Sequence, residues 1–434
     1  MRYGKRNMAE DRQRGLSRRA HWAGGDKLIS RLMAEALARP DLVSLAAGFV
    51  DQAALPVEAT QQALAALWSK LACARAALQY GTTIGYVPLR EAILARMTAA
   101  DGSAGHRPAP SVDQVVITAG SNQFLHLVAD TLLDPGDIVL CAAPSYFVFL
   151  ASLANVGART VGVEIDADGM IPEALEQELH RRKAAGKLAR VKAIYVVTYY
   201  DNPTGITTTL ARRQRLIEIA RRWSLEGTIY LIEDAAYREL RYYGDDVPSL
   251  VALDEDGDRV IHAGTFSKSF SPGIRVGWGI LPRELVEAVL AQKGNVDFGS
   301  PHFNQVLMAV VMEMGLFERH VAAVRQSYRE KLDAMLEAAH AELKPLGVQW
   351  VRPNGGLYVW LRLPETIDTG VDGPLFPLAI AEGMLYVPGE CCYPQEGCPR
   401  RRNVLRLSFG VPSIEEIRRG VKSLARAMQP LLTR

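Results

Sequence analysis

The sequence predicts an α/β protein, with a three-layer large domain around a mainly parallel β-sheet and a smaller α+β domain. The chain has 434 residues, enough for two or three domains of ordinary size. Between about residue 57 and residue 300, amphipathic helical patterns alternate with short apolar runs. These runs are β-branched and lack a period of two, which is typical of parallel strands buried on both faces.

The composition is that of an ordinary globular protein. Hydrophobic residues make up 48%, charged residues 23% and aromatic residues 7%, and 50 Lys and Arg balance 48 Asp and Glu. These values exclude disordered, collagen-like and coiled-coil chains and give no sign of a nucleic-acid groove. No apolar stretch approaches the ~20 residues of a membrane helix, so we expect neither nucleic acid nor a membrane as a partner. Five sparse cysteines indicate a reducing compartment, and we expect a cytoplasmic protein.

The first 25 residues are polar and basic and lack the apolar core of a secretory signal. A flexible arm is the simpler interpretation; a transit peptide is the alternative, against which Glu10 and Asp11 count. Apolar residues at helical spacing predict a helix over Lys27–Ala38, which Pro40 ends. The following segment, Leu42–Phe49, is predicted to be extended. We assign residues 1–55 to the arm and to part of the small domain.

Residues 56–304 are predicted to form the large domain. Its expected helices are Val57–Ala72, Val87–Ala99, Gln123–Leu133, Tyr146–Val156 and Leu210–Trp223. Its expected strands are Gln114–Thr118, Ile138–Ala142, Thr160–Val163, Ala193–Thr198, Ile229–Glu233 and Val260–Ala263.

The pattern changes after about residue 300, and residues 305–434 are predicted to form the small domain. Gln305–Leu343 is long, charged and helical, and is expected to be two helices, while Ser413–Met428 is a closing amphipathic helix. Short strands are predicted at Val348–Val351, Leu357–Leu363, Leu385–Val387 and Val404–Ser408. Loops are predicted at Pro364–Pro377 and Glu390–Asn403.

The clearest chemical signal is the segment Gly264–Trp278, just after a predicted buried strand. Lys268 lies among hydroxyl side chains, and Arg275 follows seven residues later. A lysine in such a place is easily desolvated and able to form an imine with an aldehyde cofactor. Hydroxyl groups and a guanidinium are the donors that a phosphate dianion requires. From this segment alone, a surface loop with a solvated lysine is an equally good interpretation.

A second signal is the acidic end of the predicted strand Ile229–Glu233. Asp234 follows it, and Tyr237 comes three residues later. A carboxylate at the carboxyl end of a strand lies where open α/β sheets bind ligands. Opposite a pyridine nitrogen it would keep that nitrogen protonated. A solvated strand end is the alternative.

Two further turns follow predicted strands. Asn202 lies in Tyr200–Gly205 and could donate to a phenolate oxygen, although Asn-Pro-x-Gly is also a plain turn signal. Ser121 and Asn122 stand where a helix is predicted to begin, and the free N–H groups there form an anion site. Plain N-capping by Ser121 is the alternative. The chain has no glycine-rich nucleotide-binding motif.

Together these segments resemble the fold-type I pyridoxal-phosphate enzymes, specifically the class I/II aminotransferases, from about Lys27 to the C-terminus. The resemblance is closest to the branch that holds the α-aminoadipate and kynurenine aminotransferases. Five motifs carry it: Leu45–Gly48, Tyr80–Arg90, Gly264–Lys268, Pro353–Trp360 and Leu405–Phe409.

The resemblance implies a role for each site residue. Three would be catalytic: Lys268 as Schiff-base lysine and proton shuttle, Asp234 as partner of the pyridinium, and Tyr237 as donor to the 3′ oxygen beside Asn202. Tyr146 would stack on the cofactor ring. The phosphate would be held by Ser121, Asn122, Thr265, Ser267 and Arg275, with Tyr80 reaching the phosphate of the other subunit of a homodimer. The substrate would be bound by Arg406, as the clamp on its α-carboxylate, and by Gly48, Asn202 and Arg31.

We therefore expect an enzyme that moves an amino group between an L-amino acid and a 2-oxo acid, with pyridoxal 5′-phosphate as cofactor. The alternative is a fold-type I lyase, cyclase or amino-acid oxidase, which would share every cofactor residue. A regulator with a degenerate aminotransferase domain is disfavoured, because only about 25 residues precede the predicted helix Lys27–Ala38. The substrate stays open, because Asn122, Asp201 and Val50 depart from the family pattern. Arg31 could receive a distal carboxylate, or it could lie on a solvated helix face.

Three remaining features concern loops. Cys391, Cys392 and Cys398 lack a nearby histidine and a C-x-x-C pair, so no metal site is predicted. Arg400-Arg401-Arg402 is predicted to be a solvated loop rather than an anion patch. In the resembled family the loops at Asn202–Pro203 and Ala143–Pro144 often carry a cis peptide bond, and both are candidates for one here.

Overall fold

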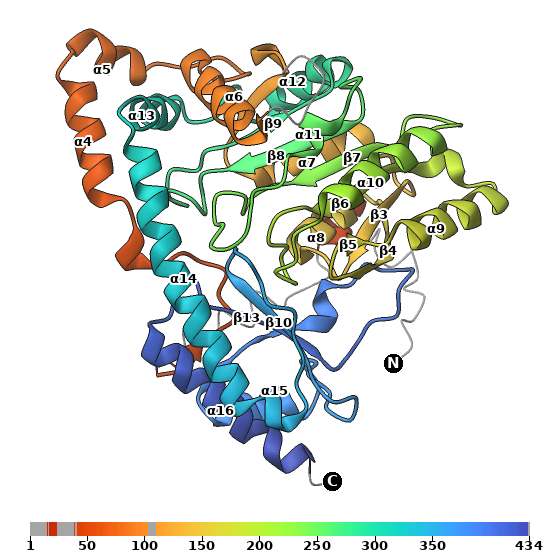
Figure 1. Cartoon of the computed structure of the whole chain (residues 1–434). Coiled ribbons are helices and arrows are strands. Elements are labelled where there is room, and N and C mark those ends of the chain that lie inside the picture. The colour runs from red at the N-terminus through yellow and green to blue at the C-terminus, as the bar shows by residue number, and fades with distance from the viewer. Residues whose placement is uncertain (1–14, 16, 24–38, 40, 103–109, 433–434) are drawn as a thin grey trace.

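A computed structural model of the chain describes residues 15, 17–23, 39, 41–102 and 110–432. The basic arm up to residue 14, the predicted helix Lys27–Ala38 and, within it, Arg31 lie outside the described residues. The described chain forms two bodies, and the long helix α14 (Leu316–Glu342) runs from one to the other (Figure 1).

The larger body is built on an eight-stranded sheet of order β2-β9-β8-β7-β6-β3-β4-β5. Its strands are β2 (Val115–Thr118), β3 (Ile138–Ala143), β4 (Arg159–Asp166), β5 (Gly169–Met170), β6 (Val191–Val197), β7 (Tyr230–Asp234), β8 (Val260–Thr265) and β9 (Gly277–Ile280). The pairs from β4 through β3, β6 and β7 to β8 are parallel, whereas β9 and β5 pair antiparallel with their neighbours. All residues of β2, β3, β7 and β8 are buried, which confirms the prediction of a mainly parallel sheet covered on both faces.

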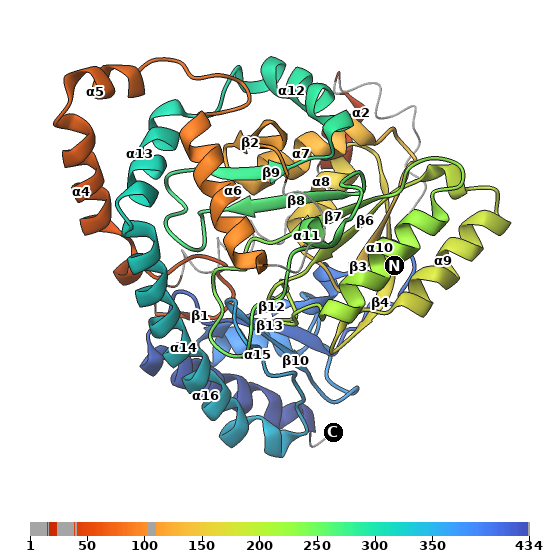
Figure 2. The same cartoon turned by 45° about the horizontal axis from the view of Figure 1, so that its top comes forward.

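Successive residues of a strand point to opposite faces of the sheet, and here both faces are apolar. Helices therefore cover both faces. Val139 and Cys141 pack in one core with α7 (Ser121–Leu132), α8 (Phe147–Asn155) and α12 (Arg283–Asp297). Ile138 and Leu140 pack in a second core with α9 (Pro172–Ala184), α10 (Leu210–Trp223) and α11 (Leu250–Leu253). A third core joins β2 and β9 to α6 (Val87–Asp101) and α13 (His302–Glu313) (Figure 2). The predicted three-layer large domain is confirmed.

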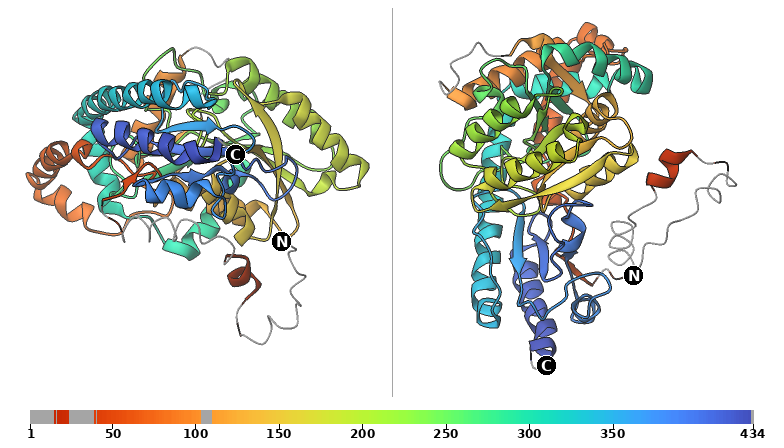
Figure 3. Two further views of the ribbon diagram at one scale, coloured as in Figure 1. Left: turned by 90° about the horizontal axis from the view of Figure 1, so that it is seen from below. Right: turned by 90° about the vertical axis from the view of Figure 1, so that its right-hand side faces the viewer.

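The smaller body is an α+β domain, as predicted. Its three-stranded antiparallel sheet has the order β10-β13-β12, from β10 (Tyr358–Arg362), β13 (Val404–Ser408) and β12 (Val387–Pro388). A second pair joins β1 (Val43–Ser44) to β11 (Met384–Leu385), so the chain before residue 55 adds a strand here. Its helices are α14, α15 (Leu375–Ala381) and α16 (Ile414–Leu432), and α16 packs along α14 (Figure 3). The domain limits at residues 55 and 304 stay a prediction.

Gln305–Leu343 is two helices, as predicted, and α13 and α14 are divided at Gly315, which is in the left-handed region. Other boundaries differ from the prediction. The predicted helix Val57–Ala72 is two helices, α4 (Val57–Trp68) and α5 (Leu71–Ala77). Val348–Val351 is not a strand, because only Gln349 bridges to β10. The prediction of a cis bond is confirmed at Ala143–Pro144, whereas Asn202–Pro203 is not cis, so the prediction was wrong for that bond.

Seven of the described α-helices and β-strands were not predicted: helices α2 (Arg18–Ala23), α9, α11, α12 and α15, and strands β5 and β9. Strand β9 has a glycine at every second position, because a Cβ on Gly279 would fall 1.9 Å from the ring of Phe124. It therefore lacks the β-branched composition that predicts strands. Helix α9 buries only four residues and is otherwise charged, which hides its apolar stripe.

A loop of the small domain covers the outer edge of β4. The backbone N–H of Gly162 donates to the Glu396 carbonyl at 2.8 Å, and the Glu396 N–H donates to Thr160 O at 3.1 Å. The Glu396 carboxylate also accepts from Arg159 Nε at 2.9 Å. The segment is otherwise irregular apart from a 3-10 turn over Gly389–Cys392, as predicted. Among the helices that the structure describes, none is both long and apolar enough to cross a membrane.

Candidate active site

A cavity of about 470 Å³ lies at the carboxyl ends of β6, β7 and β8, where these strands face the small domain. This is the edge at which open α/β sheets bind ligands. All but two of the predicted site residues line it: Gly48, Ser121, Asn122, Tyr146, Asn202, Asp234, Tyr237, Thr265, Ser267, Lys268, Arg275 and Arg406. Asp234 and Thr265 end strands β7 and β8, Ser121 and Asn122 begin helix α7, and β13 supplies Arg406.

Lys268 lies in the turn that follows β8. Its Nζ donates to the carbonyl of Gly48, from the opposite domain, at 2.7 Å. The turn is fixed by Thr265, whose Oγ1 lies 3.0 Å from Ser267 Oγ and accepts from the Ser267 N–H at 3.1 Å. The lysine is therefore half-buried at the cavity wall, held by a single carbonyl.

A cradle of hydrogen-bond donors forms one end of the cavity. Helix α7 begins at Ser121, and the Arg275 guanidinium lies against the two residues before it, with Nη2 donating to Ala119 O at 3.0 Å. Two glycines permit this approach: a Cβ on Gly120 would fall 2.6 Å from Arg275 Nη2, and one on Gly277 would fall 2.4 Å from the Ser121 nitrogen. Gly120 also has a φ of +85°, which favours glycine. A helix N-terminus, hydroxyl groups and a guanidinium fit a phosphate.

Asp234 ends β7 and is buried at the cavity wall. Its carboxylate accepts from Tyr195 Oη at 3.0 Å and from the Ala236 N–H at 3.1 Å. Burial raises the pKa of Asp234 in spite of these two hydrogen bonds. A buried carboxylate of this kind gains strongly from a cation placed opposite it, as a protonated ring nitrogen would be.

Glu233, the residue before Asp234, points to the other face of the sheet and is fully buried. It accepts from His262 Nδ1 at 2.8 Å and from Thr198 Oγ1 at 2.8 Å, and Arg213 Nη1 lies 3.4 Å away. Burial opposes the charge, but the hydrogen bond and charge of His262 and the charge of Arg213 lower the pKa of Glu233 to about 2. On the face of the sheet opposite Asp234, Glu233 therefore ties the end of β7 to His262 of β8 and to Thr198.

A polar cluster joins the two domains across the cavity. Arg406 is 3% exposed; its Nη1 donates to Asn202 Oδ1 at 2.7 Å and its Nη2 to Ala46 O at 2.8 Å. Asn202 Nδ2 in turn donates to Tyr237 Oη at 3.4 Å. Within the described residues, the buried Nε of Arg406 has no hydrogen-bond partner. A buried guanidinium with an unsatisfied donor at a cavity is suited to bind a carboxylate.

Sequence reasoning missed Tyr358, which lies at the start of β10 and lines the same cavity. Its motif was recognised, but nothing in the sequence says that this aromatic ring meets residues of the other domain. It also missed an apolar part of the wall, formed by Phe49, Phe147, Val148, Leu385 and Val387.

Two predicted site residues are not part of this cavity. Tyr80 is 82% exposed, with its ring in an edge contact with Phe298. Arg31 lies outside the described residues. Within the described chain, no group of three or more His, Cys, Asp or Glu side chains could hold a metal ion.

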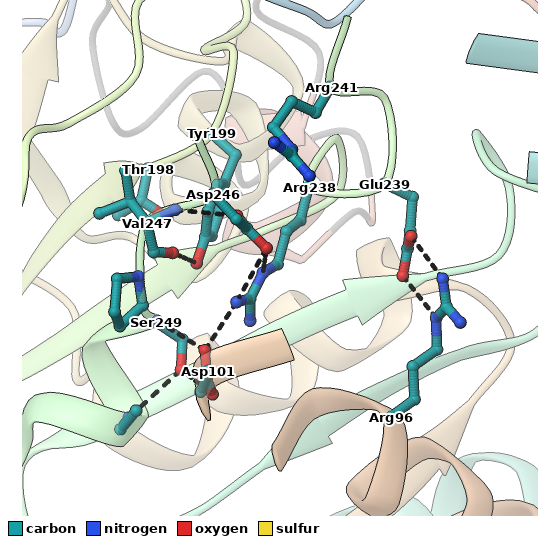
Figure 4. Close-up of polar contacts among 12 residues, drawn as sticks. Arg96, Asp101, Thr198, Tyr199, Arg238, Glu239, Arg241, Asp246, Val247 and Ser249 are labelled. Atoms are coloured by element: carbon teal, nitrogen blue, oxygen red, sulfur yellow. Dashed lines mark hydrogen bonds and ion pairs between the residues drawn. The ribbon is translucent and has the colours of Figure 1, made fainter. Parts of the chain in front are cut away.

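Ion pairs join the segment after Tyr237 to α6 (Figure 4). Arg238 bridges Asp101 and Asp246, at 2.7 and 3.3 Å from its Nη2. The next residue, Glu239, makes a two-point pair with Arg96 at 2.7 and 2.8 Å. These pairs hold the backbone on which Tyr237 stands.

Comparison with known proteins agrees with this geometry. Residues 40–424 match the family of class I and II aminotransferases. The chain is 36% identical to aromatic-amino-acid aminotransferase 1 of Thermococcus litoralis, over 90% of this chain and 88% of that protein. It is 36% identical to 2-aminoadipate transaminase of Thermus thermophilus, over 91% and 92%. The solved structure of Pyrococcus horikoshii kynurenine aminotransferase, in complex with PMP, has a TM-score of 0.87 at 33% identity and covers 98% of this chain and 99% of that one. The chain thus belongs to the class I and II aminotransferases, enzymes that use pyridoxal phosphate to move an amino group between an amino acid and a 2-oxo acid.

Proposed function

We propose that this aminotransferase acts on amino acids with large apolar side chains and that Lys268, Asp234 and Arg406 carry the reaction. The observation behind this proposal is that the three groups converge on one cavity whose remaining wall is largely apolar. Their spacing around one enclosed volume suits a substrate held at its carboxylate while its amino group faces the lysine.

Bound pyridoxal phosphate supplies an aldehyde for the amino group and a ring that withdraws electrons from the substrate Cα. Ser121, Asn122, Thr265, Ser267 and Arg275 would hold its phosphate through the donor cradle at the start of α7. Asp234 would pair with the ring nitrogen, because its buried carboxylate favours a cation opposite it. Tyr146 would stack on the ring.

The nitrogen Nζ of Lys268 moves the substrate proton. This side chain is well suited, because one carbonyl holds it at the cavity wall and leaves it able to turn. Arg406 binds the α-carboxylate with its free Nε and one Nη, while Asn202 and Ala46 O keep the guanidinium plane in place. Tyr237 and Asn202 would donate to the ring oxygen of the cofactor.

The apolar wall argues for the substrate class. Phe49, Phe147, Val148, Leu385 and Val387 form it. The cations among the described lining residues are Lys268, Arg275 and Arg406, and each already has a role. No described cation is left for a second carboxylate. An acidic substrate would therefore depend on Arg31. Of the two relatives, one is named for aromatic amino acids and the other for 2-aminoadipate.

We also propose a cytoplasmic homodimer. Six large apolar side chains are exposed at the end of α4, in α5 and just after it, and at the end of α12. They are Trp68, Leu71, Leu78, Tyr80, Val296 and Phe298. Exposed apolar side chains gathered on neighbouring elements mark a protein interface. A second copy would cover them, and Tyr80 would then reach the phosphate of the partner site. Sedimentation velocity of the holoenzyme tests this; a monomer with full activity would refute it.

A half-reaction screen tests the function and its substrate class together. Single amino acids are added to the holoenzyme, and conversion of the cofactor to its amino form is followed by absorbance. We expect aromatic and long aliphatic amino acids to react faster than aspartate or glutamate, and a 2-oxo acid to reverse the change. Ammonia or hydrogen peroxide released without a 2-oxo acid would refute amino transfer.

Substituting the lysine tests its role directly. Lys268→Ala should abolish the half-reaction while the fold is kept, because no other described amine lines the cavity. Lys422→Ala, at an exposed position on α16, is the control and should react normally. Normal turnover by Lys268→Ala would refute the assignment.

A further inference from the structure

Tyr358 occupies the point where the two domains meet inside the cavity. It is 2% exposed, and its hydroxyl oxygen lies 3.1 Å from the hydroxyl oxygen of Tyr237. The two rings meet edge to face, at 79° and 5.7 Å between centroids. A phenol hydroxyl from β10 is thus in contact with a phenol hydroxyl that follows β7.

The ring of Tyr358 supports Arg406. The guanidinium carbon lies 4.2 Å from the ring centroid, a cation–π contact. Since both Nη atoms of Arg406 are engaged by Asn202 and Ala46 O, the ring fixes the remaining freedom, the tilt of the guanidinium plane. The free Nε is thereby held in one orientation.

Gly48 lies between the Tyr358 hydroxyl and Lys268. A Cβ on Gly48 would fall 2.8 Å from the Tyr358 hydroxyl oxygen and 3.9 Å from its Cζ. The carbonyl of this glycine accepts from Lys268 Nζ at 2.7 Å. The Tyr358 hydroxyl therefore touches the backbone that positions the lysine.

The donors and acceptors define the direction of the phenol contact. Asn202 Nδ2 donates to Tyr237 Oη, and Tyr237 has one proton of its own. If that proton goes to the cofactor oxygen, Tyr358 must donate to Tyr237 rather than accept from it. A phenol that accepts two hydrogen bonds is a stronger donor through its own proton.

We propose that Tyr358 is a positioning residue of this enzyme: its hydroxyl donates to Tyr237 Oη and orients the Tyr237 proton, and its ring orients Arg406. This inference rests on the role proposed above for Tyr237. The hydroxyl of Tyr358 thus affects the pKa of the bound cofactor through Tyr237. The ring of Tyr358 affects binding of the substrate carboxylate through Arg406.

Tyr358→Phe separates the two ends. The midpoint of the spectrophotometric pH titration of the bound cofactor should rise by about 0.5–1 pH unit, the shift expected from one lost neutral hydrogen bond. We expect kcat to fall roughly 3- to 10-fold, while KM for the amino acid stays within about twofold because the ring remains. Tyr358→Leu should in addition raise KM, because the cation–π contact is gone. An unchanged titration midpoint for Tyr358→Phe would overturn the proposal.

Two further variants make the result unambiguous. Tyr242 is also buried, and its hydroxyl donates to Gly356 O at 2.6 Å, just before β10. Tyr242→Phe is the structural control and should leave the midpoint unchanged; an equal shift would mean that the effect is structural, which overturns the proposal. Tyr237→Phe should shift the midpoint at least as far as Tyr358→Phe. If it does not, the role proposed for Tyr237 fails, and the inference fails for that separate reason.

A double-mutant cycle tests the geometry itself. Gly48→Ala should lower kcat in the parent enzyme, because the new methyl group meets the Tyr358 hydroxyl at 2.8 Å. In Tyr358→Phe the closest ring carbon is 3.9 Å away, an ordinary contact, so the same substitution should have little further effect. Additive effects of the two substitutions would contradict the placement of the hydroxyl.

Discussion

Asp201 is a buried carboxyl group at which pH and stability should be coupled. It is 6% exposed and accepts from Thr204 Oγ1 at 2.6 Å and from the Thr204 N–H at 3.3 Å. Burial raises its pKa to about 7, since these hydrogen bonds only partly compensate the lost hydration and the charge of Asp234 adds to the shift. In the unfolded chain the group titrates near its ordinary value of 3.8.

The sign follows from the protons bound in each state. Between about pH 4 and pH 7 the folded chain holds a proton on Asp201 that the unfolded chain has lost, so the free energy of unfolding falls as pH rises through this window. With 1.36 kcal/mol per pKa unit, the raised pKa implies a loss of about 3 kcal/mol between pH 5 and pH 8. Asp201→Asn keeps an acceptor for Thr204 but has no charge, so this loss should disappear.

The measurement is urea unfolding of the parent and of Asp201→Asn at pH 5 and pH 8. From pH 5 to pH 8, we expect the free energy of unfolding to fall by about 3 kcal/mol less in the variant than in the parent. At pH 8 the variant should be the more stable protein. Asp372→Asn, at an exposed position just before α15, is the control and should change the stability little. An identical pH dependence for parent and Asp201→Asn would refute the reasoning.

Three other predictions concern charged groups. Asp234→Asn should keep the fold but lower the half-reaction rate more than tenfold, because one charge-assisted pair is worth roughly 1.5–3 kcal/mol; stopped-flow absorbance checks this, and a smaller loss would point to another residue. Glu233→Gln should remove about 3 kcal/mol of stability that is present above pH 4.5 and lost as pH falls toward 2; the parent and the variant should thus differ at pH 7 and converge in acid unfolding curves. Arg31→Ala should lower kcat/KM roughly 10- to 150-fold for glutamate or aminoadipate but not for neutral amino acids; a uniform effect would return Arg31 to a solvated helix face.

The large domain could be predicted from the sequence because its strands are buried on both faces. All six predicted strands are present, within a few residues of their expected ends. The exceptions have physical causes. Strand β9 has two glycines among its four residues, which admit Phe124 and the start of α7, so its composition does not indicate a strand. Helix α12 buries only three residues, and its pattern is correspondingly weak.

The cofactor side of the site was predictable, whereas its small-domain side was only partly so. Residues such as Asp234 and Lys268 follow strands of one parallel sheet, so strand ends and motifs together place them at one edge. The contact of Tyr358 with Tyr237 depends instead on how the two domains face each other across 121 positions of sequence. No local pattern encodes such a distance. The apolar wall has the same origin, because Leu385 and Val387 belong to short strands of the small domain.

The loop that covers β4 has a consequence for the chain during synthesis. Arg159 and its partner Glu396 are 237 positions apart, so β4 emerges from the ribosome long before the loop that closes its outer edge. At about 5–20 residues per second, that edge stays open for roughly 10–50 s. An uncovered strand edge is a template for pairing with other chains. The nascent large domain is therefore a natural client for a chaperone, and chains truncated before residue 396 should aggregate even though their eight-stranded sheet is complete.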